Sequence, residues 1–177
     1  MNNPSINLKV KYLDKNSQIF SHGRSYLCSA MILEESLADH PNNIYPILTL
    51  LGLSIELFFK GLDVIDTSEK YQIDGLVFSG PHQTKTNLKG GHDLQELFES
   101  MSHIDHDMYT YLLDEFSRKY NYNLLTVLEK NKKIFINTRY AYENSGNRKY
   151  ISEFNEILNT ANFLYESFNK LISEIHH

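Results

Sequence analysis

The sequence lacks the features that mark several common classes of protein. Its 177 residues contain one cysteine and no tryptophan, and no cysteine pair, signal peptide or transit-like segment is visible. These absences predict a cytoplasmic location without disulfide bonds. There is also no basic excess, because 17 Lys and Arg stand against 22 Asp and Glu, a formal net charge of -5. A strongly basic nucleic-acid-binding protein is therefore excluded, and any contact with nucleic acid must be local.

Most catalytic and cofactor motifs are absent as well. The sequence has no phosphate loop, no G-x-G-x-x-G, no H-E-x-x-H and no nucleophile elbow. One run, S-H-I-D-H-D, places His103 and His106 beside Asp105 and Asp107 and has the composition of a metal site. It falls where one helix ends and another begins, and carboxylates there commonly cap helices. We therefore predict neither a metal nor a cofactor.

What the sequence does contain is typical of a globular protein. A hydrophobic fraction of 41% and a charged fraction of 22% exclude wholesale disorder, and the chain length fits one domain. Twelve tyrosines and ten phenylalanines provide large apolar surfaces for packing. The lone Cys28, which follows Leu27 in a helical pattern, is interpreted as a small core residue. His176 and His177, at the end of the chain, are assigned no function because they are either native or the remnant of a tag.

The stretch from Asn43 to Ile65 predicts the central helix of the protein. Pro46 sits where a first-turn proline is tolerated, and Asn43 is positioned to cap the first amides. Apolar residues follow at helical spacing on almost every face, which predicts that neighbouring helices cover the whole helix. These residues are Leu48, Leu51, Ile55, Phe58, Phe59 and Leu62.

Two charges interrupt this stretch near its middle. Glu56 and Lys60 lie four residues apart, in the order that favours an ion pair along a helix. Each charge at a bilayer centre would cost about 2.5 to 3.5 kcal/mol, so we predict that the stretch does not span a membrane. A partly buried pair needs further polar partners from other helices. It either fixes the register of the helix or lines a polar site.

The rest of the chain predicts an all-α, single-domain bundle of four or five main helices. Residues 1–15 read as a flexible arm, and residues 16–177 as the helical domain. Glycines and polar residues between Asp66 and Gly91 indicate a long loop, in which Tyr71 to Phe78 resembles a lone strand. That loop carries His82, Lys85 and Lys89. The remaining predicted helices are 16–39, a helix after Asp93, Asp105 or Asp107 to Lys119, 124–142 with a polar break at 129–133, and 148–175.

The start of the helix after the loop combines a structural signal with an unexplained histidine. Asp93 and Glu96 have the spacing of a capping box, although the motif prefers Ser or Thr at the first position. His92 precedes them and follows Gly90 and Gly91, which allow close approach to the backbone. The histidine either faces an anionic group or bonds the loop.

Three segments in order resemble the HEPN superfamily of helical nucleotide- and RNA-associated domains. They are S-I-E-L-F-F-K-G-L at Ser54–Leu62, G-H-D-L-Q-E-L-F at Gly91–Phe98 and F-I-N-T-R-Y-A-Y-E at Phe135–Glu143. The resemblance covers Ser17 to Ile175. It implies a bundle of four or five main helices that often dimerises through the faces carrying the late arginine motif.

The chain departs from the ribonucleases of that superfamily at one position. Those enzymes carry an arginine and then, after four to six residues, a histidine. Here Arg139 is followed by Tyr140, and Asn144 stands five residues on. An asparagine cannot act as a general acid or base, so this site has no evident group for moving the proton of a 2′-hydroxyl. No histidine follows at that spacing after Arg24, Arg118 or Arg148 either.

The R-Y form resembles the branch of the superfamily described as substrate- or nucleotide-binding, some members of which act beside a separate nucleotidyltransferase. The resemblance implies one ligand-binding site made of Glu56, Lys60, His92, Asp93, Arg139 and Tyr140. In such a site Arg139 would hold phosphate and Tyr140 would stack on a base. The alternative is that Arg139 pairs with Asp93 or Glu56 as a buried polar clasp between helices.

Three functional hypotheses follow. The first is a non-catalytic HEPN-like module that binds a nucleotide, RNA or a protein partner, in a prokaryotic defence or toxin-antitoxin system. It is expected as a homodimer, with a nucleotidyltransferase-type protein as a further partner and no membrane. The second is a divergent metal-independent endoribonuclease, a toxin that uses Arg139 with His92. The third is a dimeric scaffold protein, with rows of exposed Tyr and Phe as its interface.

Overall fold

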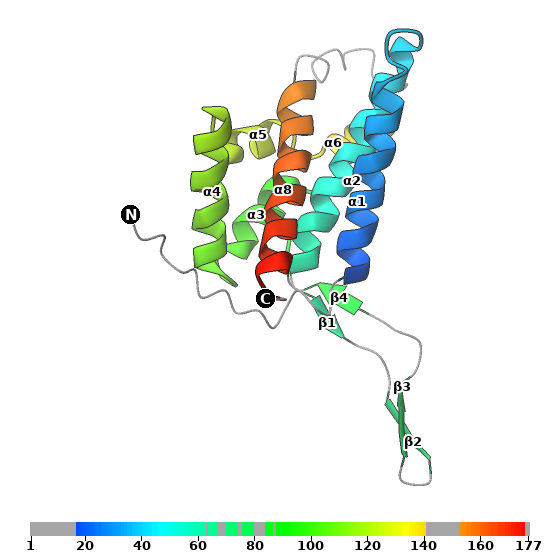
Figure 1. Cartoon of the computed structure of the whole chain (residues 1–177), viewed down its shortest axis with the longest axis vertical. Helices are drawn as coiled ribbons and strands as arrows, with labels where there is room; N and C mark the ends of the chain where they lie inside the picture. Colours follow the sequence, from blue (N-terminus) through cyan, green and yellow to red (C-terminus); the bar gives the residue numbers. More distant parts are fainter. Residues whose placement is uncertain are drawn as a thin grey trace.

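The computed structural model describes residues 17–62, 64–66, 70–73, 76–79, 84–86, 88–140 and 153–175. In these residues the chain is a bundle of helices with a few short strands (Figure 1), so the predicted all-α fold is confirmed. The predicted N-terminal arm lies outside the described residues. The helices are α1 (Ser17–Glu34), the short 3-10 helix η3 (Pro41–Asn43), α2 (Ile44–Leu62), α3 (Leu94–Met101), α4 (His106–Tyr120), α5 (Leu124–Lys130), α6 (Ile134–Arg139) and α8 (Phe154–Ile175).

Helix α2 is the centre of the bundle, as its apolar pattern predicts. It packs against α1, α3, α6 and α8, so that neighbours cover it on several sides. Of the six apolar side chains singled out in the sequence, Leu62 is half-buried and the other five are buried, with exposed fractions of 1% or less. They are Leu48, Leu51, Ile55, Phe58 and Phe59. By length and composition, Pro41–Leu62 could cross a membrane, but 61% of its most apolar window is buried inside the bundle.

Helices α1 and α2 form the antiparallel pair expected from their short connection. Gly23 of α1 lies against Phe58, and the Ser54 hydroxyl donates a hydrogen bond of 2.8 Å to the Gly23 carbonyl. At the other end of the contact, Ile19 lies beside Gly61. The small residues allow the two helices to approach closely, which buries Leu27 and Ala30 of α1.

Three details of this helix pair differ from the sequence predictions. Helix α1 ends at Glu34 instead of residue 39, and turns follow it. Within the described residues no amide of α2 bonds the side-chain oxygen of Asn43, whose amide nitrogen instead donates a 2.7 Å hydrogen bond to the Ser36 hydroxyl. The prediction that Cys28 is a core residue is wrong: it is exposed. In a helix each residue is turned by about 100° from the last, so Cys28 points away while Leu27 is buried.

Aromatic clusters attach the last helix to the bundle. Phe20 of α1, Phe58 of α2, and Tyr165 and Phe168 of α8 lie within ring-contact distance of one another, with centroids 5.2 to 6.2 Å apart. A second cluster joins α4 to α8 through Phe116, Tyr120, Tyr122 and Phe163. Burial of such rings is the largest apolar contribution that single side chains make to a core. The predicted residues 148–152 of this helix lie outside the described ones.

Four short strands follow α2, three of them within the segment predicted as one long loop. The first begins at Val64, inside the stretch predicted as the central helix, because α2 ends at Leu62 instead of Ile65. Strand β1 (Val64–Asp66) pairs with β4 (Thr84–Thr86), and β2 (Lys70–Ile73) pairs with β3 (Leu76–Ser79), both antiparallel. The strand expected to be alone therefore has a partner, with Tyr71 opposite Phe78. Figure 1 shows the β2–β3 pair extending away from the bundle. Of the basic loop residues, Lys85 pairs with Ile65, Lys89 is exposed, and His82 lies outside the described residues.

The stretch predicted as one helix with a polar break is two helices. Helix α5 ends at Lys130, a turn follows, and α6 begins at Ile134. Asn131 in that turn is buried, and its amide donates to the Val127 carbonyl at 2.9 Å. Helix α6 packs along α2. The break therefore redirects the chain so that Arg139 and Tyr140 end up beside the central helix.

Candidate functional site

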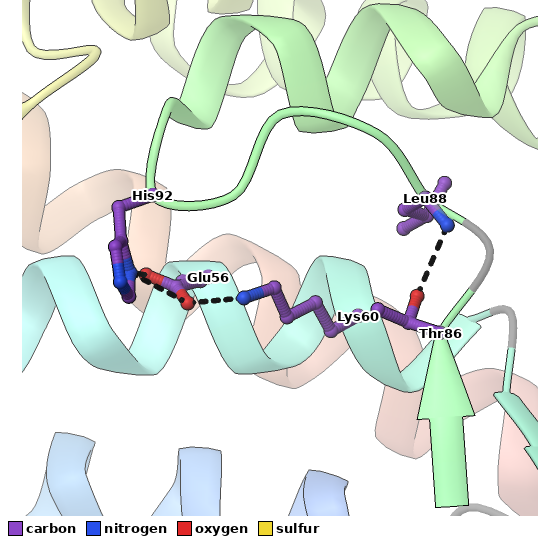
Figure 2. A network of polar contacts seen from close by, with 5 residues as sticks. All are labelled: Glu56, Lys60, Thr86, Leu88 and His92. Carbon is purple, nitrogen blue, oxygen red and sulfur yellow. Dashed lines mark hydrogen bonds and ion pairs between the residues drawn. The ribbon is translucent and has the colours of Figure 1, made fainter.

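Three of the predicted site residues make one polar cluster. The Glu56 carboxylate on α2 accepts hydrogen bonds from Lys60 on the same helix and from Nδ1 of His92, which lies 2.9 Å from Oε2 and 3.1 Å from Oε1. Figure 2 shows Lys60 extending along α2 toward Glu56, and His92 reaching from the chain segment before α3 to the same carboxylate. His92 thus supplies the further polar partner that the buried ion pair requires. The pair therefore also contacts a second part of the chain, the segment before α3.

Exposure differs sharply within the cluster. The Glu56 side chain is only 5% exposed, Lys60 is 21% exposed and His92 is 51% exposed. A buried carboxylate needs partners that satisfy its lone pairs, and here a cation and an imidazole do so. The histidine therefore joins the buried carboxylate to the solvent.

Two glycines bring His92 to its position. Gly90 and Gly91 have positive φ angles of 127° and 58°, which side chains other than glycine rarely adopt. A Cβ on Gly90 would also lie 2.7 Å from the Leu97 amide nitrogen, which leaves no room for a side chain. The chain therefore turns tightly at the start of α3 and directs His92 toward α2.

Asp93 has a structural function that its spacing predicted. Its carboxylate accepts hydrogen bonds from the amides of Gln95, at 3.1 Å, and Glu96, at 3.2 Å, and it is the N-cap residue of α3. The cap fixes the first turn of the helix that directly follows His92. Asp93 lies near the cluster because it directly follows His92 in the chain, and its carboxylate bonds the α3 amides and not the cluster.

Phe135 belongs to this region, although sequence reasoning did not select it. Its ring lies 5.2 Å from the His92 ring, centroid to centroid. The closeness of α6 to α2 places it there: a Cβ on Gly52 would lie 2.8 Å from Cγ2 of Ile134 and 3.2 Å from the Phe135 amide nitrogen. The signal in the sequence was its spacing, because Phe135 precedes Arg139 by four residues and shares its helix face.

Arg139 and Tyr140 lie at the end of α6 and contact each other. The guanidinium carbon is 5.6 Å from the centre of the Tyr140 ring. Arg139 is exposed, and Tyr140 is 39% exposed. Among the described residues, no ion pair joins Arg139 to a carboxylate. The alternative of a buried clasp between Arg139 and Glu56 or Asp93 is therefore wrong, because Lys60 and His92 hold Glu56 and the α3 amides hold Asp93.

The six predicted residues thus fall into two contacting groups and a helix cap. Phe135 is related to both groups, because it touches His92 and lies one helical turn before Arg139. Neighbours at this spacing are roughly 5 to 6 Å apart at their Cβ atoms. Together they supply an imidazole, an aromatic ring, a guanidinium and a phenol. These are the groups with which proteins bind phosphates and stack on bases.

The structure also accounts for part of the run that resembles a metal site. The Asp105 carboxylate accepts a 2.9 Å hydrogen bond from the Met108 amide and is the N-cap residue of α4, as the sequence interpretation proposed. His103 and His106 are exposed at this junction. No group of three or more His, Cys, Asp or Glu side chains that could hold a metal ion occurs within the described ranges.

A groove of about 350 Å³ lies elsewhere, between α4 and α8. Two of its cations are paired with carboxylates, Arg118 with Glu115 and Lys119 with Glu166. The hydrogen bond from Lys119 to Glu166 raises the pKa of this lysine above its ordinary value of 10.5. None of the six predicted site residues lines the groove, whose lining residues are Tyr111, Glu115, Arg118, Lys119, Phe163, Glu166, Ser167 and Lys170.

Comparisons with protein-family models, with curated proteins and with solved structures find no significant match for this chain.

Proposed function

We propose that the protein is a HEPN-like module that binds a nucleotide or single-stranded RNA without cleaving it. The observation that carries this proposal is the exposed Arg139 above the Tyr140 ring. A guanidinium that is held by a ring and exposed to solvent can offer its planar donors to a phosphate. The neighbouring phenol ring can stack on a base.

The polar cluster supports the same proposal. Lys60 brings a positive charge to the Glu56 carboxylate, so His92 faces solvent beside a neutralised pair and not beside a lone anion. Phe135 contacts the histidine and precedes Arg139 by one helical turn, and its ring adds an apolar surface. A nucleotide combines phosphate, sugar and a flat base, and these parts match the guanidinium, the imidazole and the aromatic rings. The overall negative charge of the chain, formally -5, favours such a local site over a broad basic surface.

A binding measurement tests the proposal. Fluorescence anisotropy would follow a labelled uridine oligoribonucleotide of about eight residues, a length within the ~4 to 16 nucleotides that single-strand-binding folds cover. We expect Arg139→Ala and Tyr140→Ala each to weaken binding about tenfold, because loss of one stacked base contact costs ~1 to 3 kcal/mol.

Arg118→Ala is the matched control for this measurement. Arg118 is also an exposed arginine near a helix end, but it is paired with Glu115 and lies on α4. Its removal should leave affinity unchanged. If the wild-type protein binds neither the oligonucleotide nor mononucleotides, or if all three variants lose affinity equally, the proposed site is wrong.

A divergent endoribonuclease is the second candidate, because a buried carboxylate orients His92. Glutamate bound to Nδ1 of an exposed imidazole is the arrangement that proteins use for proton transfer. In this alternative Arg139 would stabilise phosphate charge. Incubation of RNA with wild type and with His92→Ala decides between the candidates. Cleavage that His92→Ala abolishes would support the nuclease, and intact RNA in both would support binding alone.

A dimeric scaffold is the third candidate. The rows of exposed Tyr and Phe expected for its interface are not found in the described residues, where Tyr26 and Tyr140 are the exposed aromatic side chains. Two other large apolar side chains, Met31 and Ile32 of α1, are 46% and 68% exposed. We propose a homodimer for the binding module too, in the cytoplasm, with a nucleotidyltransferase-type protein as a further partner and a role in defence or a toxin-antitoxin system. Light scattering of the purified chain gives the oligomeric state, and a monomer would contradict both the scaffold and the homodimer.

A further inference from the structure

We propose that Glu56 positions His92 so that its free ring nitrogen recognises the 2′-hydroxyl of a ribose. The inference rests on the proposed binding of a nucleotide or RNA and names the sugar that the site selects. It assigns Glu56 a positioning role and gives His92 direct contact with the ligand.

The direction of the hydrogen bonds fixes which nitrogen is free. An ionised carboxylate can only accept, so the two short contacts to Glu56 require the proton of His92 to be on Nδ1. In the neutral ring, Nε2 then carries a lone pair and no proton. In this neutral form the nitrogen available to a ligand is a hydrogen-bond acceptor.

Burial makes this arrangement rigid. Glu56 is on the central helix, its side chain is 5% exposed, and Lys60 holds the carboxylate from the other side. Figure 2 shows the imidazole reaching from the chain before α3 down to this carboxylate. The ring also lies against Phe135. With one edge held and one face covered, the remaining edge keeps a fixed direction, and the 51% exposure of the side chain leaves it open to a ligand.

An acceptor at this place selects among the groups of a nucleotide. Phosphate oxygens only accept, so the lone pair of Nε2 cannot bond them. Base edges differ from one nucleotide to the next, whereas every ribonucleotide carries a 2′-hydroxyl that can donate. Deoxyribose lacks this group. The Phe135 ring beside His92 offers an apolar surface against which the sugar or its base can pack.

The test compares three uridine oligonucleotides of equal length and label: ribose, 2′-deoxyribose and 2′-O-methyl ribose. The methyl ether keeps the oxygen but removes the proton that Nε2 would accept. We expect wild type to bind the ribose form about three- to tenfold more tightly than either analogue, the effect of one hydrogen bond. Binding is measured in the cold, and gel electrophoresis checks that the RNA stays intact.

Variants separate recognition from folding. His92→Phe keeps a ring beside Phe135 but has no acceptor, so this variant should bind the ribose and deoxyribose forms with about equal affinity. His92→Gln places an amide oxygen within reach of the same position and should restore part of the preference. Arg139→Ala should lower the affinity for all three oligonucleotides by the same factor and leave the ratio of ribose to deoxyribose affinity unchanged. His103→Phe, at an exposed histidine on the α3–α4 junction, is the control that should change nothing.

The outcomes distinguish this inference from the proposed function. Equal affinity of the wild-type protein for ribose and deoxyribose overturns the inference and leaves nucleotide binding standing. No affinity for any oligonucleotide overturns both. A preference for ribose that survives in a folded His92→Phe also overturns the role of His92. Thermal melting of each variant shows whether it is folded, and the wild-type ratio remains decisive if a variant is not.

Discussion

The hydroxyls of Thr49 and Thr138 lie 2.8 Å apart and share a hydrogen bond, although 89 residues separate them in the chain. This bond joins α2 to α6. One turn away on α2, Gly52 lies against Ile134 and the Phe135 backbone. The bond and the close contact together hold α6 against the central helix, and they set where Phe135 and Arg139 stand relative to His92.

Gly52→Ala should destabilise the protein by about 1 to 3 kcal/mol, the usual cost of overpacking a core. The added Cβ would meet Cγ2 of Ile134 at 2.8 Å and the backbone nitrogen of Phe135 at 3.2 Å. Backbone cannot rotate away as a flexible side chain can, so α6 must shift. Urea unfolding followed by circular dichroism measures the change in the free energy of unfolding.

Gly61→Ala is the matched control on the same helix. There the new Cβ would find its nearest neighbours, Ile19 and Phe20, at 3.8 and 3.9 Å, which is ordinary contact. This change should raise stability by about 0.4 to 1 kcal/mol, because alanine has less freedom than glycine in the unfolded chain. Equal stability of the Gly52→Ala variant and wild type would show that α6 does not pack on α2 as described.

Asp93→Ala should cost about 1 kcal/mol of stability, within the ~0.5 to 2 kcal/mol range for helix caps. The loss comes from two amides of α3 that no longer have the carboxylate as acceptor. Asp93→Asn keeps an acceptor oxygen and should be nearly as stable as wild type. In the nucleotide-binding assay, Asp93→Asn should retain full affinity. A large loss of affinity in this stable variant would show that the carboxylate itself contacts the ligand.

Raising the pH above about 10 should destabilise the protein partly through Tyr122. Burial raises the pKa of its phenol above the ordinary 10.0, and the nearby charge of Glu156 raises it further. A hydrogen bond donated by Asn159 opposes this shift. A folded-state pKa above the unfolded one means that this contribution is complete below the unfolded pKa. It is lost as the pH rises through the folded pKa.

Tyr122→Phe should therefore unfold with a shallower dependence on pH in this alkaline range. At neutral pH the variant should lose about 0.5 to 1.5 kcal/mol, because the Asn159 amide loses its 3.1 Å acceptor. Chemical unfolding at a series of pH values measures both effects. Identical slopes for the variant and wild type above pH 10 would contradict the role of Tyr122.

Cys28 should react with Ellman's reagent in the native protein at a rate close to that in denaturant. Its side chain is exposed on α1, and one equivalent should be released because the chain has one cysteine. Cys28→Ser should change stability by less than about 0.5 kcal/mol, as for other surface substitutions. A thiol that reacts only after unfolding would restore the original interpretation of Cys28 as a core residue.

Local patterns in the sequence predicted most of the helices. The apolar spacing in α2, the cap at Asp93 and the cap at Asp105 each depend on residues within a few positions of one another, and all three appear in the structure. The β2–β3 pair was missed although its signal was local. Asp74-Gly75 separates the two strands in the sequence, and Asp-Gly between apolar runs is a strong hairpin signal.

The candidate site was only partly predictable, because its contacts are not local. The ion pair from Lys60 to Glu56 follows from a spacing of four residues. The contact of His92 with Glu56 spans 36 residues and depends on the path of the chain through the strands between them. Phe135 was missed for the same reason: only the close packing of α6 on α2 brings it to His92.

Because Glu56 lies on α2, its carboxylate should keep its place for as long as the domain stays folded. Amide hydrogens in the most buried helix of a domain generally exchange with solvent only when the whole domain opens, whereas those in loops exchange by small local motions. Because Glu56 lies on the central buried helix, we expect the amides around it to belong to the slowest class of this protein. The docking point of His92 is therefore expected to persist for as long as the domain stays folded.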